Sequence, residues 1–77
     1  MWKLKILTGD LAGQSFSLQE GDNGVGRSPS NQIHLKSTCV SKTHCVFKVN
    51  GSAIAIKDLG SSNGTFVNGI KVDQSIL

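Results

Sequence analysis

The sequence predicts an all-β fold, an antiparallel β-sandwich that forms one small domain. Short segments in which apolar and polar residues alternate recur along the chain, and turn residues separate them roughly every eight to twelve positions. No window has the apolar spacing of an amphipathic helix over the length that a helix needs. With 77 residues, 38% of them hydrophobic, the chain can build one small core, and a large buried active site is not expected.

Eight segments carry the period-two alternation or the β-branched and aromatic content of strands. In chain order they are residues 2–7, 14–18, 25, 32–35, 43–49, 53–57, 65–67 and 70–72. The third is a short strand at most, because residues 20–24 combine Glu, Gly, Asp and Asn and predict a turn cluster. Phe16, Phe47 and Phe66 fall at positions that face the core.

Two asparagine-glycine pairs predict hairpin turns. Asn50-Gly51 closes the hairpin before residues 53–57, and Asn68-Gly69 closes the last one. Asn68-Gly69 suits a two-residue type I′ turn, because both residues tolerate the positive φ angles that this turn requires.

The loop after residue 25 carries the only arginine of the chain, Arg27, directly after Gly26. A guanidinium fork can bind two oxygens of a phosphate at once, and glycine keeps the backbone beside it uncrowded. Ser41 and Lys42, just before residues 43–49, add a hydroxyl donor and an ammonium group. These side chains predict an anion site if the sheet brings the two loops together.

A third polar loop lies within residues 58–69, which also contain the last hairpin turn. Gly60 and Gly64 allow positive φ on either side of a short polar run, so that the loop can turn back on itself. Ser62 offers a hydroxyl, and Asn63 offers an amide that can donate to and accept from a peptide backbone. This stretch is predicted to be a binding loop that leads into a hairpin.

Composition narrows the classes of partner and compartment. Eight basic and five acidic residues give a net charge of +3, a mild bias toward anionic partners. Two cysteines are too few for a disulfide framework, and the sequence contains no signal peptide and no apolar stretch of membrane length. We therefore expect a reduced, cytoplasmic setting without a membrane partner.

Other chemistries find little support. Ser41 and His44 could suggest a nucleophile and its base, but residues three apart on a strand point to opposite faces, so an enzyme is not expected. The two histidines and two cysteines match no zinc-ligand spacing, and we expect neither a metal nor another cofactor. Nucleic acid is not an expected partner either, because the lysines are scattered and the phenylalanines face the core.

The loop residues follow an order that is typical of a known family. That order is Gly26-Arg27, then Ile33 and Leu35, then Ser41-Lys42-Thr43-His44, then Asp58, Asn63-Gly64-Thr65 and Val67-Asn68-Gly69. Over nearly the whole chain it resembles the forkhead-associated (FHA) domain family, which implies the FHA/SMAD-like β-sandwich. The resemblance also implies that loops at one end of the sandwich bind phosphothreonine peptides.

Carried over by position, the resemblance implies roles for nine residues. The phosphopeptide contacts would be Arg27, Ser41, Lys42, Ser62 and Asn63. The positions that support the site would be Gly26, His44, Gly64 and Asn68. Asn63 corresponds to the asparagine that holds the peptide main chain. Lys42 is a departure, since the family often has arginine or asparagine there, and lysine lacks the bidentate geometry of arginine.

His44 is expected to act through structure rather than by touching phosphate. It opens the predicted core strand on the face opposite Cys45, where its ring can bond neighbouring loops and hold Ser41 in place.

The resemblance implies further strands after residue 72, which would return beside residues 2–7. Because the sequence stops at residue 77, where that turn would begin, we expect residues 1–77 to be a single domain, the N-terminal part of a longer protein, without the last C-terminal strands. The edge beside residues 2–7 would then be uncovered and open to self-association.

The functional expectation is a phosphothreonine-peptide recognition module for phosphorylation-dependent protein-protein interaction in signalling. Two alternatives stay open. One is a scaffold of the same fold that packs on a partner without phosphate, in a bacterial secretion or signalling assembly. The other is a nucleic-acid binder, which only the net charge favours.

Overall fold

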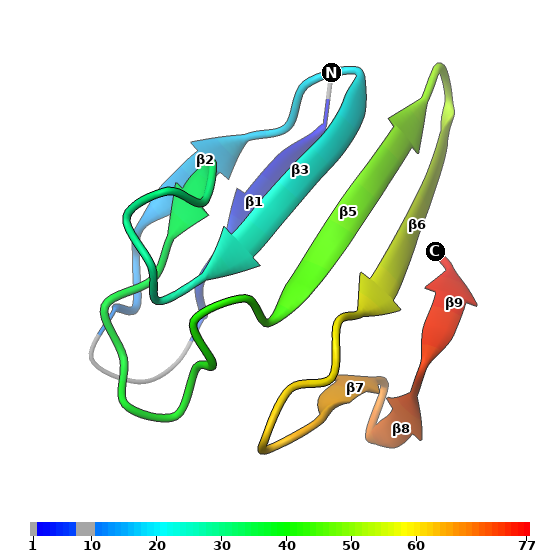
Figure 1. Cartoon of the computed structure of the whole chain (residues 1–77). Helices are drawn as coiled ribbons and strands as arrows, with labels where there is room; N and C mark the ends of the chain where they lie inside the picture. Colours follow the sequence, from blue (N-terminus) through cyan, green and yellow to red (C-terminus); the bar gives the residue numbers. More distant parts are fainter. Residues whose placement is uncertain (1, 8–10) are drawn as a thin grey trace.

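A computed structural model of the chain describes residues 2–7 and 11–77, and within them it contains nine strands and no helix (Figure 1). The largest sheet has five strands in the order β4-β3-β5-β6-β9. Its strands are β3 (Gly21–Gly26), β4 (Ile33–His34), β5 (Cys45–Asn50), β6 (Ala53–Asp58) and β9 (Gln74–Ile76). Two smaller antiparallel sheets pair β1 (Lys3–Lys5) with β2 (Ser15–Ser17) and β7 (Thr65–Val67) with β8 (Ile70–Val72). The predicted all-β class is confirmed, with β3–β4 as the one parallel pair in the described sheets.

The core lies between the five-stranded sheet and the β1–β2 pair, and in Figure 1 strand β1 passes behind β3. Its buried members are Leu18, Val25, Ile33, Cys45, Phe47, Val49, Ile54 and Ile56. Leu4 of β1 and Phe16 of β2 pack against this cluster from the other layer. The predicted inward face of the central strand, with Cys45, Phe47 and Val49, is therefore confirmed. Burial of these apolar side chains is the main source of stability in a domain of this size.

Strand β3 is the largest departure from the sequence prediction. The predicted turn cluster at residues 20–24 is wrong, and so is the prediction that Val25 marks only a short strand. Instead, β3 runs for six residues and pairs antiparallel with β5 from Gly21↔Val49 to Val25↔Cys45.

Asn23 gives the physical reason. Its side chain is fully buried and satisfied: Oδ1 accepts from the backbone of Gln19 (2.8 Å) and from Gln32 Nε2 (2.9 Å). Its Nδ2 group donates to the carbonyls of Gln19 (2.8 Å), Gly21 and Phe47 (both 3.2 Å). A polar residue can occupy a central strand when its hydrogen bonds are complete, so this network overrides the low strand preference of glycine, aspartate and asparagine.

The two hairpin turns differ in how well the sequence predicted them. Asn68 and Gly69 have φ angles of 52° and 82°, as the predicted type I′ turn requires. In the other hairpin Asn50 pairs with Ala53, so the loop is Gly51-Ser52, one residue later than predicted. Gly51 has a positive φ of 60° and Ser52 does not. A positive φ at the first central residue alone is typical of a type II′ turn.

Two further predictions are corrected near the end of the chain. Residues 74–76, where no strand was predicted, form β9 along the edge of β6. Phe66 does not face the core and is 58% exposed, because Thr65 takes the inward position with 7% exposure and successive strand residues point to opposite faces.

The β1 strand pairs with β2 on one side, and the described residues place no strand on its other side. Trp2, next to this edge, is 37% exposed. Self-association through the edge stays a prediction. None of the segments that the structure describes forms a helix long and apolar enough to cross a membrane.

Candidate functional site

The structure brings the three polar loops of the sequence analysis together at one end of the five-stranded sheet. They are residues 27–32 after β3, residues 35–44 before β5 and residues 59–64 after β6, and Figure 1 shows the corresponding strand ends side by side. Ser41 connects all three, since its carbonyl accepts from Arg27 N–H (3.0 Å) and its Oγ accepts from Ser62 N–H (2.9 Å). The middle loop is therefore bonded to both of its neighbours.

Arg27 and Lys42 face a pocket of about 260 Å³ that Ser28 and Pro29 also line. Both cationic residues are exposed. Among the described residues, neither the Arg27 guanidinium nor the Lys42 ammonium donates to a protein acceptor. A guanidinium fork and an ammonium group that share one pocket and lack a protein partner are suited to bind an anion with several oxygens.

Gly26, the last residue of β3, allows the two cationic loops to approach each other. A Cβ added to it would overlap the Lys42 carbonyl oxygen and would lie 2.6 Å from Asn31 Nδ2. A side chain at this position would push residues 27–32 away from residues 35–44, so glycine is needed for the close approach and not for its conformational freedom.

His44 links the middle loop to the third loop. Its Nδ1 accepts from Ser41 N–H (3.1 Å), and its Nε2 lies 3.0 Å from the Gly64 carbonyl, to which it must donate. These two bonds assign the neutral ring with its proton on Nε2. The prediction that His44 opens the core strand is wrong, because β5 begins at Cys45 and His44 lies in the loop before it. The ring bonds the backbone of Ser41 and not its hydroxyl, which is not the geometry of a nucleophile and its base.

Asp58 organises the third loop, a role that the sequence analysis did not assign. Its carboxylate accepts from the N–H groups of Gly60 (2.9 Å) and Ser61 (3.2 Å) and from the hydroxyls of Ser61 (2.5 Å) and Thr65 (2.7 Å). Hydrogen bonds from the Ser61 and Thr65 hydroxyls, the two largest causes, lower the pKa of Asp58 from 3.8 to about 2. The available signal was the aspartate two residues before a glycine, a common turn-forming pattern.

Ser62 and Asn63 lie on the exposed surface of this loop. Asn63 Nδ2 donates to the Cys39 carbonyl (2.8 Å), which orients the amide and ties the third loop to the middle one. Gly64 has a φ of 85°, the left-handed conformation that the sequence analysis expected. Asn68 lies at the opposite end of β7 from Gly64, in the hairpin turn, and so away from the three loops.

Asn31 is a second residue that the sequence analysis did not single out. Its Nδ2 donates to the carbonyls of Ser28 (2.9 Å) and Lys42 (2.7 Å). Its position in a run of serine, proline and asparagine indicated a turn, but the bond to Lys42, eleven residues away, has no local sequence signal.

The titratable residues that the structure describes do not gather into a metal site. Within residues 2–7 and 11–77, no group of three or more histidine, cysteine, aspartate or glutamate side chains is placed to hold a metal ion. Burial, followed by the charge of Asp58, raises the pKa of Cys45 to about 11, so this thiol stays protonated in the core. Cys39 is also a free thiol, and it is exposed.

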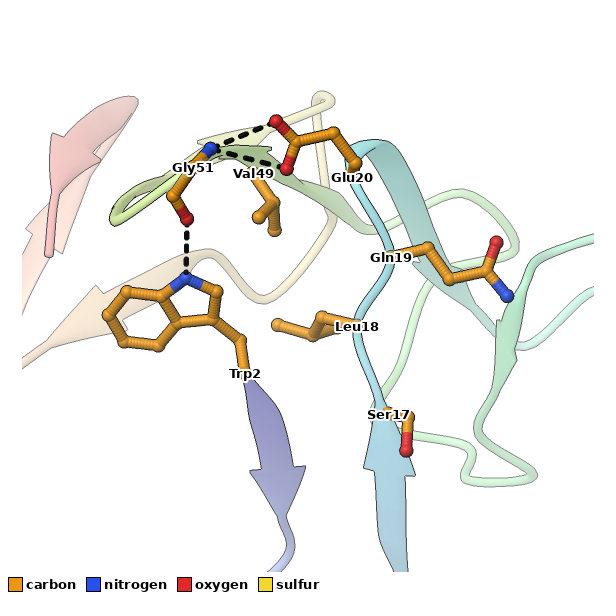
Figure 2. Close-up of a pocket in the computed structure, with 7 residues that line it drawn as sticks. All are labelled: Trp2, Ser17, Leu18, Gln19, Glu20, Val49 and Gly51. Carbon is orange, nitrogen blue, oxygen red and sulfur yellow. Dashed lines mark hydrogen bonds between the residues drawn. The ribbon is translucent and has the colours of Figure 1, made fainter.

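A larger pocket, of about 640 Å³, lies at the other end of the sandwich beside the β5–β6 hairpin (Figure 2). The Trp2 indole packs beside Leu18 and Val49, and its Nε1–H donates to the Gly51 carbonyl (3.3 Å). Gly51 N–H in turn donates to the Glu20 carboxylate at 2.9 and 3.2 Å. This pocket is mostly apolar, and the one charged side chain in its lining is an acid, so it is unsuited to a phosphate.

Comparison with known proteins gives consistent matches. The family model of the FHA domain matches residues 23–77. The chain is 36% identical over 74 residues to the glycogen accumulation regulator GarA of Mycolicibacterium smegmatis, a match that covers 96% of this chain and 47% of the relative. The chain thus spans about half the length of the curated relatives it matches.

Two solved structures have the same arrangement of strands. One comes from a structural and functional analysis of phosphothreonine-dependent FHA domain interactions, with a TM-score of 0.88, 35% identity and coverage of 97% of this chain and 76% of that chain. The other is the FhaA FHA domain in complex with the intracellular domain of Rv3910. It has a TM-score of 0.82 and 37% identity, and the match covers 88% of this chain and 75% of that chain.

Proposed function

Because this chain belongs to the FHA domain family, we propose that it is a non-enzymatic module that recognises phosphothreonine in a partner protein or peptide. One observation carries the proposal: the exposed side chains of Arg27 and Lys42 share a pocket, and backbone bonds to Ser41 and Lys42 hold the loops that present them. Free cysteines suit a reducing compartment, so we place the module in the cytoplasm.

The chemistry of the pocket matches a dianion. A phosphorylated threonine carries a charge of about −1.5 to −2 at neutral pH and three acceptor oxygens. Arg27 would supply two parallel donors, Lys42 a mobile point charge, and Ser41 and Ser62 a hydroxyl each. Hydrogen bonds to charged groups each contribute about 1.5–3 kcal/mol net, so a ligand without the phosphate loses most of its binding energy.

Asn63 would read the main chain of the peptide. One hydrogen of its amide is already donated to the Cys39 carbonyl, which fixes the plane of the group. The second hydrogen and the Oδ1 atom remain for a peptide N–H and C=O beside the phosphothreonine. Since these are backbone groups, Asn63 contributes affinity without selecting a particular neighbouring residue.

A titration with a degenerate peptide library that has phosphothreonine at one fixed position tests the proposal. The control is the same library with threonine at that position, and a third titration uses duplex DNA. We expect binding of the phosphorylated library alone. Equal binding of both libraries would favour a scaffold that does not need phosphate, and binding of DNA alone would favour a nucleic-acid binder.

A further inference from the structure

We propose that Asn31 is a positioning residue for the phosphate pocket, because its side-chain amide clamps together the two loops that carry Arg27 and Lys42. The expected effect of Asn31 on ligand binding rests on the proposed function. The clamp itself is a property of the free protein and can be tested without any ligand.

The clamp is built from both hydrogens of one amide group. One hydrogen goes to the Ser28 carbonyl (2.9 Å), in the residue that follows Arg27, and the other goes to the carbonyl of Lys42 itself (2.7 Å). Asn31 also donates its backbone N–H to Ser28 (3.1 Å). The side chain thereby fixes the main chain directly beside each of the two cationic residues.

Few other bonds hold these loops together. Between them the backbone contributes Arg27 N–H to the Ser41 carbonyl (3.0 Å) and Ser28 N–H to the Lys42 carbonyl (3.2 Å). Both belong to exposed irregular loops, where backbone bonds open more readily than in a buried sheet. The amide of Asn31 shares the Lys42 carbonyl with Ser28 N–H, so its loss would weaken the closure between the loops.

The neighbouring strand leaves room for a side chain of this size. Asn31 lies against β3, where a Cβ added at Gly24 would be 3.3 Å from its Oδ1 and a Cβ added at Gly26 would be 2.6 Å from its Nδ2. An aspartate would fit the same space but would direct a carboxylate oxygen at two carbonyl oxygens. The site therefore selects an amide by its donors as well as by its size.

Gln32 provides a matched control in the same loop. It is also an amide, and its Nε2 also donates a hydrogen bond, but to Asn23 Oδ1 (2.9 Å) in β3 and not to the loop that carries Lys42. If any lost hydrogen bond in residues 27–32 loosened the pocket, Gln32→Ala would have the same effect as Asn31→Ala.

Hydrogen exchange in the free protein is the first test. In Asn31→Ala we expect the amides of Arg27 and Ser28 to exchange about tenfold faster, as expected for the loss of roughly one net hydrogen bond, while amides of β5 and β6 keep their rates. Gln32→Ala should leave Arg27 and Ser28 within twofold of wild type. Asn31→Asp keeps the volume, removes the donors and places a carboxylate oxygen against the two carbonyls, so Arg27 and Ser28 should exchange at least tenfold faster in this variant too. It provides the test if the alanine variant folds poorly. Unchanged exchange of Arg27 and Ser28 in Asn31→Asp would overturn the clamp.

The second test measures the binding of N-acetyl-phosphothreonine methylamide by NMR titration. We expect about tenfold weaker binding for Asn31→Ala and a smaller factor when the same change is made in a Lys42→Ala background, because part of its action is through Lys42. Equal factors in the two backgrounds would overturn the positioning of Lys42 by Asn31. If wild type does not bind this probe better than the threonine analogue, the proposed function fails, while the exchange data still decide on the clamp.

Discussion

The two ends of the sandwich each carry a pocket, and they differ in how the pocket is made. At the hairpin end, Trp2, Leu18 and Val49 line about 640 Å³ of mostly apolar space, with Glu20 already bonded to Gly51 N–H (Figure 2). At the loop end, about 260 Å³ is lined by Arg27 and Lys42, whose charged groups have no protein partner in the part of the chain that the structure describes.

The comparison shows that the larger of these two pockets is not the one suited to an anion. At the hairpin end the Trp2 indole and the Glu20 carboxylate are already bonded to Gly51, and the charged group in the lining is an acid, so this pocket gains little from an anion. The loop end uses backbone bonds to hold its loops and leaves two cationic side chains for a ligand, which is how anion sites are usually prepared. Substitutions at the two ends should therefore separate binding from stability.

The largest expected effect on binding comes from Arg27→Ala. Phosphopeptide affinity should fall by about a hundredfold or more, because two charge-assisted hydrogen bonds are lost. The melting temperature should stay the same, since Arg27 is exposed and contributes no core volume. Arg27→Lys should also lose most of the affinity, because an ammonium cannot replace the fork. Calorimetric titration checks both variants, and an affinity within twofold of wild type would remove Arg27 from the site.

His44→Ala should reduce binding and stability together. The change leaves Ser41 N–H and the Gly64 carbonyl without their partner, which should lower the free energy of unfolding by about 1–3 kcal/mol and loosen two of the three loops. A urea melt and a peptide titration on the same sample measure both effects. Weaker binding at unchanged stability would instead make His44 a direct ligand contact.

Acid should act on the third loop through Asp58. Because hydrogen bonds from Ser61 and Thr65 hold the pKa of this carboxyl at about 2, below its ordinary 3.8, the folded state favours the charged form. Its contribution to stability is present above about pH 4 and is lost as the pH falls toward 2. Urea melts of wild type and Asp58→Asn at pH 6 and pH 3 test this, and the gap between the two proteins should narrow at pH 3. A larger difference in stability between the two proteins at pH 3 than at pH 6 would contradict this account, because the charged form of Asp58 would then not be the stabilising one.

Trp2→Ala should have the smallest effect on binding, although it alters the larger pocket. Phosphopeptide affinity should stay within twofold of wild type, while the free energy of unfolding falls by about 1–2 kcal/mol, less than for a buried tryptophan because Trp2 is 37% exposed. Paired titration and denaturation measure the two quantities. A loss of affinity comparable to that of Arg27→Ala would erase the distinction between the ends.

The predictability of each region follows from the range of the interactions that shape it. The Asn68-Gly69 turn and the inward face of β5 depend on local pattern, and both were predicted. Strand β3 depends on the bonds of Asn23 to Gln32 and Phe47, which are distant in sequence, so its composition pointed to a turn. Local propensity fails where a tertiary network decides the conformation.

The site shows the same limit. Arg27 and Lys42 could be named as candidate anion ligands from residue type and order, whereas the bonds that hold their loops could not be predicted. Asn31 contacts the Lys42 carbonyl across eleven residues, and Asp58 Oδ1 accepts from Thr65 seven residues later. Such contacts depend on how strand ends are brought together, which period-two alternation does not determine.

The most direct test is to titrate ¹⁵N-labelled protein with N-acetyl-phosphothreonine methylamide and map the amide chemical shifts onto the two ends. Recognition of phosphothreonine at the loop end predicts the largest shifts at Arg27, Ser41 and Ser62, with Trp2 Nε1 and Gly51 unchanged, and no response to the threonine analogue. Shifts centred on Trp2 and Gly51, or equal responses to the two compounds, would contradict it.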